Sequence, residues 1–382
     1  MLTVLDPKSA VAQKLQRMEA TAQAKREPLL PAKRRQPRDI QPVFKETVQV
    51  AGRDVEVWND EFFSRLRRLH GVPDDFLNLA REKSVDLTLA RSESKLGKGG
   101  DLQFTSSCST YVIKSASGDD HKSLLVRAEA YVDRLMKGSS LIVPIYLHFR
   151  DPLTGKAYIA MRNLTTPDVK WDEKYDLKGC ADDKTVMRAG KLIEPVHKRF
   201  YRMDMWCRCM WTAKRHTYFE GKVRGRAFHF DFPKSQRDQI VRMVQDDAQW
   251  LTSQGLMDYS LFVAIRRVHR SEVEPSIFGS GCTANGTIGA GSASSAVRQW
   301  AMRDGDTVVF VTLSIIDFLQ PWTPGKKVAQ CIKFLECNKA TIPPAAYGAR
   351  FKRHFAERLR GVDRLKPFDA ASAVAAAQGA AC

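Results

Sequence analysis

The chain has 382 residues and a formal net charge of +18 at pH 7, and it is long enough for one large two-lobed domain or two ordinary ones with a sizeable core. Residues 187–226 and 326–366 each have a net charge of +8, and charge localised in this way favours a polyanionic partner. No apolar run reaches the roughly 20 residues of a membrane span, and the eight scattered cysteines form neither a disulfide framework nor a zinc-site pattern.

The composition changes near residue 42. Residues 1–42 are rich in Ala, Gln, Lys and Arg and contain several prolines. Such a segment buries too little apolar surface to pack, so we expect a basic disordered arm. Residues 54–91 then show the apolar periodicity of a helix. We expect the folded domain to begin at about residue 43.

A glycine cluster follows this region. Gly97, Gly99 and Gly100 precede a short alternating stretch at 102–105, and residues 111–114 are predicted to form the returning strand. Glycines let backbone N–H groups approach phosphate oxygens closely, because no Cβ intervenes. Most such clusters are only turns. Lys114, which follows two β-branched residues on the returning strand, strengthens the phosphate-binding interpretation.

The next segment completes a small lobe. An apolar stripe predicts a helix over 119–137, and residues 141–149 and 158–161 have the pattern of a hairpin. We expect an N-lobe over about 43–165 with an antiparallel sheet and helices. Glu129 on the predicted helix is either the ion-pair partner of Lys114 or a surface charge.

Two aspartates mark the larger lobe, which we place at about 166–366. Asp258 follows a predicted helix over 236–254 and precedes a strand over 259–268, while Asp317 ends a strand over 307–316. A lone aspartate is usually a cap or turn residue. A pair at adjacent strand ends, however, is what phosphoryl transfer requires: one orients the attacking hydroxyl and the other holds Mg²⁺.

Other parts of this lobe are less regular. A Ser- and Gly-rich segment predicts a flexible insertion over about 270–305. A helix is expected over 345–361, and the Ala-rich residues 367–382 are expected to be a disordered tail. The usual protein-kinase motif is absent, because Asp258 is not preceded by His-Arg.

Three motifs resemble those of the phosphatidylinositol phosphate kinases: Tyr175-Asp176-Leu177-Lys178-Gly179, Met257-Asp258-Tyr259-Ser260-Leu261 and Ile315-Ile316-Asp317. The resemblance continues in the glycine cluster, in Val112-Ile113-Lys114, in Lys326-Lys327 and in Tyr347-x-x-Arg350-Phe351, and it covers about residues 50–366. It implies an α+β, bilobal kinase-like fold with a larger mixed C-lobe and a flat basic membrane-facing surface.

The resemblance also implies roles for individual residues. The three glycines would cover the phosphates of ATP, Lys114 would pair with them, and Asp317 would bind Mg²⁺. Asp258 would face an inositol-ring hydroxyl of a phosphatidylinositol monophosphate, and Lys178 would reach toward the transferred phosphate. Cys180 stands where this family usually has Ser, which is a mild departure.

Residues 318–350 correspond to the family's specificity loop. Lys326, Lys327, Lys333 and Lys339 flank apolar residues at helical spacing, which is typical of a short helix lying on anionic lipid; the alternative is a helix packed on the C-lobe. Ala329 resembles the residue of 4-kinases, whereas 5-kinases generally have Glu at this position. Both regiochemistries stay open.

The alternatives belong to other functional classes. A catalytically silent scaffold that binds phosphoinositide membranes would share the basic surface, and a protein kinase would share the aspartates. Residues 187–226 mix charges with Trp206, Trp211 and Tyr218, which also suits single-stranded nucleic acid. No RNA-binding signature accompanies them, so we expect no nucleic-acid partner. We expect a cytoplasmic protein peripherally bound to the cytosolic face of membranes; the sequence does not predict an oligomeric state.

Overall fold

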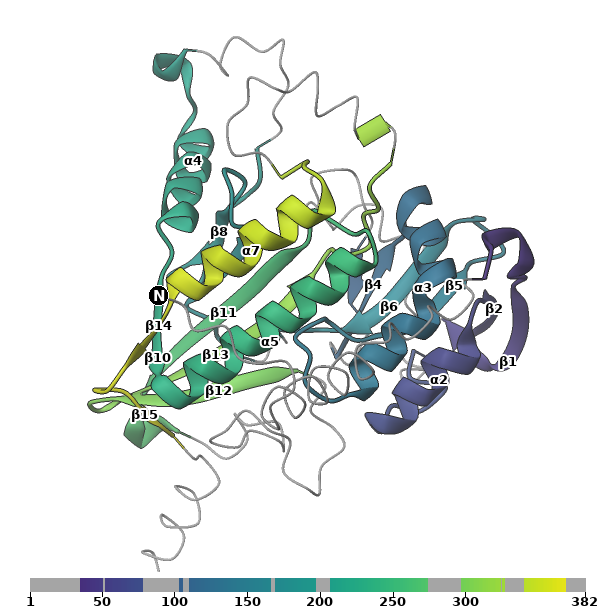
Figure 1. Cartoon of the computed structure of the whole chain (residues 1–382), viewed down its shortest axis with the longest axis horizontal. Coiled ribbons are helices and arrows are strands. Elements are labelled where there is room, and N and C mark those ends of the chain that lie inside the picture. The colour runs from purple at the N-terminus through teal and green to yellow at the C-terminus, as the bar shows by residue number, and fades with distance from the viewer. Residues whose placement is uncertain are drawn as a thin grey trace, which may run out of the picture. The chain divides into compact units, whose positions relative to one another are not determined.

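The computed structural model describes residues 35–50, 52–77, 103–105, 110–165, 169–196, 207–273, 297–323, 325–326 and 340–368. Residues 1–36 form a unit of their own, and the fold described here belongs to the second unit, which begins at Pro37. Its described elements form two large sheets and one two-stranded sheet, with helices packed on the large sheets (Figure 1).

The first sheet has six strands in the order β1-β2-β5-β6-β4-β3, and all neighbours are antiparallel. The helices α2 and α3 pack on each other, and α2 also packs on β5. A capping box begins α3, in which Ser117 and Asp120 exchange hydrogen bonds between side chain and backbone. The elements are η1 (Pro37–Asp39), β1 (Val43–Val50), β2 (Arg53–Val57), α2 (Asp60–Leu69), β3 (Gln103–Thr105), β4 (Tyr111–Ser115), α3 (Gly118–Met136), β5 (Ile145–Arg150) and β6 (Ala157–Arg162).

The helix predicted over 54–91 is wrong in its first part. Residues Arg53–Val57 form β2, in which Val55 and Val57 are buried and their neighbours are not. Burial of every second residue is typical of a strand. The strand β2 is too short for this pattern to be recognised beside the helical pattern of α2. The strand β1 was not predicted, because its apolar and polar residues do not alternate cleanly. Residues 78–91 lie outside the described part of the chain.

The second sheet has seven strands in the order β15-β12-β13-β11-β7-β8-β9. In Figure 1, α5 and α7 lie side by side across one face of this sheet, and α4 packs on β8. The parallel pair β10–β14 makes this lobe mixed. Its elements are β7 (Glu173–Leu177), β8 (Lys184–Arg188), β9 (Lys191–Leu192), η4 (Arg208–Met210), α4 (Ala213–Arg226), β10 (Phe230–Pro233), α5 (Lys234–Ser253), β11 (Ser260–His269), η5 (Arg270–Glu272), β12 (Arg298–Asp304), β13 (Thr307–Ile316), α7 (Pro344–Arg358), β14 (Leu359–Val362) and β15 (Lys366–Pro367).

Two predicted boundaries in this lobe are wrong. The strand β12 falls inside the insertion predicted over 270–305, because its flanking Arg, Gln and Asp residues conceal the buried Trp300 and Met302. The C-terminal helix ends at Arg358, where the chain continues as β14, which pairs with β10. A strand that is formed by pairing with a distant segment leaves little signal in its own residues.

A short segment joins the two sheets. Residues 141–143 run beside the end of β13: the N–H of Ile315 donates to the carbonyl of Leu141 at 2.6 Å, and the N–H of Val143 donates to the carbonyl of Ile315 at 3.0 Å. The buried Asp247 of α5 accepts hydrogen bonds from Ser140 Oγ at 2.9 Å and from the Leu141 N–H at 2.6 Å. The α+β fold expected from the sequence is confirmed. No helix in the described residues has the length and apolar character to cross a membrane.

Candidate active site

The pairing of β11 with β13 brings the two predicted aspartates to one edge of the sheet. These strands are antiparallel and Ser260 lies opposite Ile316, so Asp258, two residues before the first, and Asp317, one residue after the second, share that edge. Both aspartates have left-handed backbones, with φ of 65° and 56°. A non-glycine residue in this region costs about 1–3 kcal/mol and persists only where the surroundings impose it, which is typical of functional sites.

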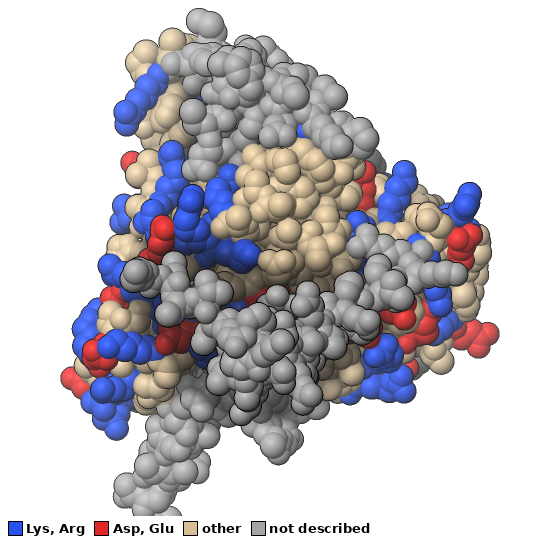
Figure 2. Space-filling view, viewed as in Figure 1, with Lys and Arg blue, Asp and Glu red and all other residues tan. Residues whose placement is uncertain are grey.

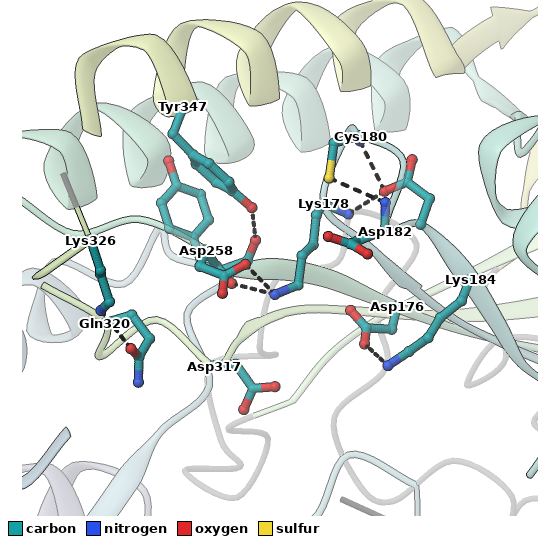
Figure 3. A network of polar contacts seen from close by, with 12 residues as sticks. Asp176, Lys178, Cys180, Asp182, Lys184, Asp258, Asp317, Gln320, Lys326 and Tyr347 are labelled. Atoms are coloured by element: carbon teal, nitrogen blue, oxygen red, sulfur yellow. Dashed lines mark hydrogen bonds and ion pairs between the residues drawn. The ribbon is translucent and has the colours of Figure 1, made fainter. Parts of the chain in front are cut away.

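Lys178 reaches Asp258 from the neighbouring strand. It follows β7, which pairs with β11 through Leu177 and Leu261, and its side chain is 18% exposed. The Lys178 Nζ donates to the Asp258 carboxylate and, at 2.8 Å, to the Asp258 carbonyl (Figure 3). Burial acts to lower the pKa of Lys178, but the carboxylates of Asp258 and Asp176 outweigh it and raise the pKa. The ammonium therefore stays protonated beside the aspartate.

Lys114 is a residue of the first sheet that contributes to the site. It lies on β4, and its Nζ is 2.8 Å from the carboxylate of Asp317, which is 48% exposed. Of the two alternatives for Glu129, the structure shows the surface charge: Glu129 is exposed on α3 and makes no ion pair with another described residue. The acid that α3 contributes instead is Asp120, in its first turn, whose side chain lines the same cavity as Lys114.

A cavity of about 200 Å³ opens between the two sheets at this point. It is lined by five charged side chains, by Ser115 and Gln320, and by six apolar side chains. An apolar wall beside a cluster of lysines and carboxylates suits a ligand with a flat ring and a polyanionic tail. The charged residues are Lys114, Asp120, Lys178, Asp258 and Asp317, and the apolar ones are Val143, Ile145, Ile159, Met161, Phe318 and Leu319.

The donor set fits magnesium bound together with a nucleotide. Mg²⁺ prefers oxygen ligands and is often held by one or two carboxylates, with waters and substrate phosphates completing its shell. Asp317 supplies such a carboxylate at the cavity. No group of three or more His, Cys, Asp or Glu side chains able to hold a metal by themselves occurs among the described residues.

Sequence reasoning missed the residue that shapes the Lys178 loop. The carboxylate of buried Asp183 accepts hydrogen bonds from the backbone N–H of Lys178 at 2.6 Å and of Cys180 at 3.2 Å. Gly179 between them has a φ of 69°, which only glycine adopts readily. Burial raises the pKa of Asp183 to about 6 and lowers the pKa of nearby His354 to about 4. Nothing in the local sequence distinguishes Asp183 from its neighbour Asp182.

The C-terminal motif supports the segment around Asp258. Tyr347 lies on α7, and its hydroxyl donates to the carbonyl of Tyr259 (Figure 3). The Arg350 guanidinium lies 5.1 Å from the centre of the Tyr347 ring. This segment is also held by the backbone of the loop after β13, because the Met257 N–H donates to the Gln320 carbonyl at 3.0 Å. The left-handed Asp258 is therefore fixed from both sides.

Lys326 lies differently from the expectation for a lipid-binding loop. Its Nζ donates to the side chain of Gln320 at 2.7 Å and to the carbonyl of Pro321 at 2.9 Å, while Gln320 donates to Asp120 at 2.6 Å. Burial lowers the pKa of Lys326. This lysine is thus turned toward the mouth of the cavity. The other predicted residues of the glycine cluster and the loop lie outside the described part of the chain: Gly97, Gly99, Gly100, Lys327, Ala329, Lys333 and Lys339.

The chain is similar in sequence to a family of known proteins. The family model described as "Phosphatidylinositol-4-phosphate 5-Kinase" matches residues 85–358. A phosphatidylinositol 4-phosphate 5-kinase type-1 alpha from Mus musculus is 24% identical over 343 residues, which cover 80% of this chain and 57% of that protein. A phosphatidylinositol 5-phosphate 4-kinase type-2 gamma from Danio rerio is 25% identical over 221 residues, covering 56% of this chain and 46% of that protein.

A probable phosphatidylinositol phosphate kinase from Dictyostelium discoideum is 25% identical over 225 residues, which cover 56% of this chain and 28% of that protein. The chain thus spans less than two thirds of the length of these curated relatives. The family match itself extends over more than half of the chain and includes both aspartates, Lys114 and Lys178. The chain belongs to the phosphatidylinositol-4-phosphate 5-kinase family.

Proposed function

We propose that this protein is a lipid kinase that transfers the γ-phosphate of ATP to an inositol-ring hydroxyl of a phosphatidylinositol monophosphate. One observation carries the proposal: two lysine–aspartate pairs, Lys178–Asp258 and Lys114–Asp317, face one cavity with an apolar wall. Family membership supports the same reaction class.

Each pair has its own task in this proposal. The apolar wall around Val143 and Ile159 receives the adenine ring, and Lys114 binds the phosphates that follow it. Asp258 orients the attacking hydroxyl and accepts its proton. Lys178, kept protonated by the surrounding carboxylates, stabilises the negative charge on the phosphoryl group as it moves. Bound through Asp317, Mg²⁺ would neutralise charge on the nucleotide phosphates.

The position that is phosphorylated stays open within the proposal. The relatives include proteins named as 5-kinases and one named as a 4-kinase, and Ala329 lies outside the described residues. Either reaction gives phosphatidylinositol 4,5-bisphosphate when the other position already carries phosphate. We also propose that the protein works on anionic membranes at their cytosolic face, which the localised positive charge supports.

The decisive experiment mixes the purified protein with Mg²⁺, ATP and short-chain phosphatidylinositol monophosphates, and separates the 3,4-, 3,5- and 4,5-bisphosphate products. We expect one bisphosphate to form. Asp258→Asn and Asp317→Asn should each lower kcat by about 100-fold or more, whereas Asp75→Asn, a change at an exposed aspartate away from the cavity, should leave kcat unaltered.

Absence of any bisphosphate product, or full activity of both active-site variants, would refute the kinase assignment. Vesicle binding without turnover would then favour the catalytically silent scaffold. Phosphorylation of a peptide in the absence of lipid would favour a protein kinase instead.

A further inference from the structure

Exposed apolar side chains gather on the outer face of α4 and the 3-10 turn that precedes it. Met210 is 53% exposed and Val223 is 59% exposed, although both are large apolar residues. The neighbouring Trp211 and Phe219 stack on each other with ring centroids 4.3 Å apart. We call this surface the α4 face, and it consists of Arg208, Met210, Trp211, Phe219, Val223 and Arg224.

The α4 face is hollowed. A depression of about 420 Å³ is lined by Trp211, Phe219 and Val223 and by the polar side chains of Arg208, His216, Glu220 and Arg224. The guanidinium of Arg208 lies 5.8 Å from the centre of the Trp211 ring. Apolar side chains beside two arginines and one glutamate leave a net positive charge, which is complementary to an amphiphile with an anionic head.

The opposite side of α4 is already used for packing. Tyr218, Gly221, Lys222 and Gly225 are buried there, and a Cβ on Gly225 would lie 2.5 Å from the backbone nitrogen of Lys184 on β8. The exposed apolar side chains therefore do not belong to the contact between α4 and the sheet. Because Tyr218 is buried, it is unavailable for stacking on bases, which removes part of the support for a nucleic-acid surface in this window.

The exposed charges on and beside α4 favour an anionic partner. Arg208, Lys214, Arg224 and Arg226 are exposed, whereas Glu220 is the exposed acid of α4 itself. Figure 2 shows Lys and Arg side chains among uncharged side chains along α4. Apolar side chains flanked by cations are typical of an element that lies in the headgroup region of an anionic bilayer.

The inner side of α4 also contacts the catalytic loop. The Lys222 Nζ donates to the carboxylate of Asp182 at 3.2 Å, and Asp182 belongs to the same short loop as Lys178 and Cys180. The element with the exposed apolar face is thus tied directly to the loop that supplies a lysine to the active site.

We propose that the α4 face docks onto anionic lipid bilayers, with Met210 and Val223 entering the headgroup layer and the flanking arginines binding lipid phosphates. Docking there places the Lys178 loop, through Lys222 and Asp182, at a fixed orientation to the membrane that holds the substrate. The inference rests on the proposed function only for the identity of that substrate.

Vesicle sedimentation tests the proposal with the full-length chain and vesicles of phosphatidylcholine, alone or mixed with phosphatidylserine. The double variant Met210→Ser/Val223→Ser and the single variant Arg224→Glu should each bind the mixed vesicles about ten-fold more weakly than wild type. The matched control is Leu153→Ser in the turn between β5 and β6, where a leucine is 73% exposed; its binding should equal that of wild type. Thermal unfolding checks that the variants are folded.

A second measurement separates this proposal from the proposed function. Activity on a dispersed short-chain lipid should be the same in wild type and in the double variant, while activity on vesicle-borne lipid should fall with binding. Wild-type binding by the double variant, or equal weakening by Leu153→Ser, would overturn the docking surface and leave a protein partner as the occupant of the hollow. Absence of turnover on short-chain lipid would overturn the kinase assignment alone, because the sedimentation result decides the docking surface by itself.

Discussion

Replacement of Asp183 by asparagine tests how the loop that carries Lys178 is held. One carboxylate oxygen of Asp183 accepts the backbone hydrogen bonds of this loop, and the other faces Nε2 of His354 at 3.6 Å without a hydrogen-bond partner among the described residues. Because burial lowers the pKa of His354 to about 4, a carboxylate faces a neutral imidazole at neutral pH. Asparagine keeps the accepting oxygen and adds an N–H that can donate to His354.

The size of the expected stability difference follows from the raised pKa of Asp183. The pKa of Asp183 is about 6 in the folded protein, because burial disfavours the charged form, against an ordinary value of 3.8. The folded state therefore binds the proton more tightly, and this stabilisation is fully present below about pH 4 and is lost as the pH rises through about 6. The difference between the folded and ordinary pKa values of Asp183 corresponds to about 3 kcal/mol of stability. Wild type loses at most this much as the pH rises, and the asparagine variant does not lose it.

Thermal unfolding of wild type and Asp183→Asn between about pH 4 and about pH 8 measures the effect. The two midpoints should nearly coincide at the acid end, and the variant should become more stable by roughly 2–6 °C near neutral pH. Asp75→Asn, at an exposed aspartate, is the control, and its curve should run parallel to that of wild type. Parallel curves for Asp183→Asn as well would refute the argument, since ionisation of the buried carboxylate would then carry no penalty.

Two further predictions concern the same region. Gly225→Ala should destabilise the protein by about 2–4 kcal/mol, because the new Cβ would lie 2.5 Å from the Lys184 nitrogen, whereas Gly221→Ala, whose nearest atoms are at 3.3 Å, should cost less; equal unfolding midpoints for the two variants would contradict this. Burial raises the pKa of the Cys180 thiol to about 11, so iodoacetamide should alkylate the exposed Cys209 and spare Cys180 in the native protein. Mass spectrometry of the peptides gives the answer, and equal labelling of both cysteines would show that the Cys180 loop opens.

Much of the secondary structure follows from the sequence where apolar periodicity is sustained. The strand predicted at 307–316 has those bounds in the structure, and the helix predicted at 119–137 is found at Gly118–Met136. Shorter elements were predicted less well. The strand β12 has only a few buried side chains, and it is a strand because β13 and β15 pair with it.

The candidate site, like the secondary structure, was predictable from the sequence only in part. That Asp258 precedes one apolar strand and Asp317 follows the next was visible in the sequence, and the motifs around them indicated the family that the comparisons confirm. The sequence did not show that Asp120 rather than Glu129 lines the cavity. The helix α3 carries several acids, and only its packing decides which of them faces the cavity.

The family, and with it the proposed reaction class, could therefore be inferred from residue types in fixed local order at the ends of buried strands. Only the tertiary structure decided which charges pair. Lys178 and Asp258 are 80 residues apart, and Lys114 and Asp317 are 203 residues apart. Such contacts depend on strand register and on the meeting of two sheets, which local periodicity does not record.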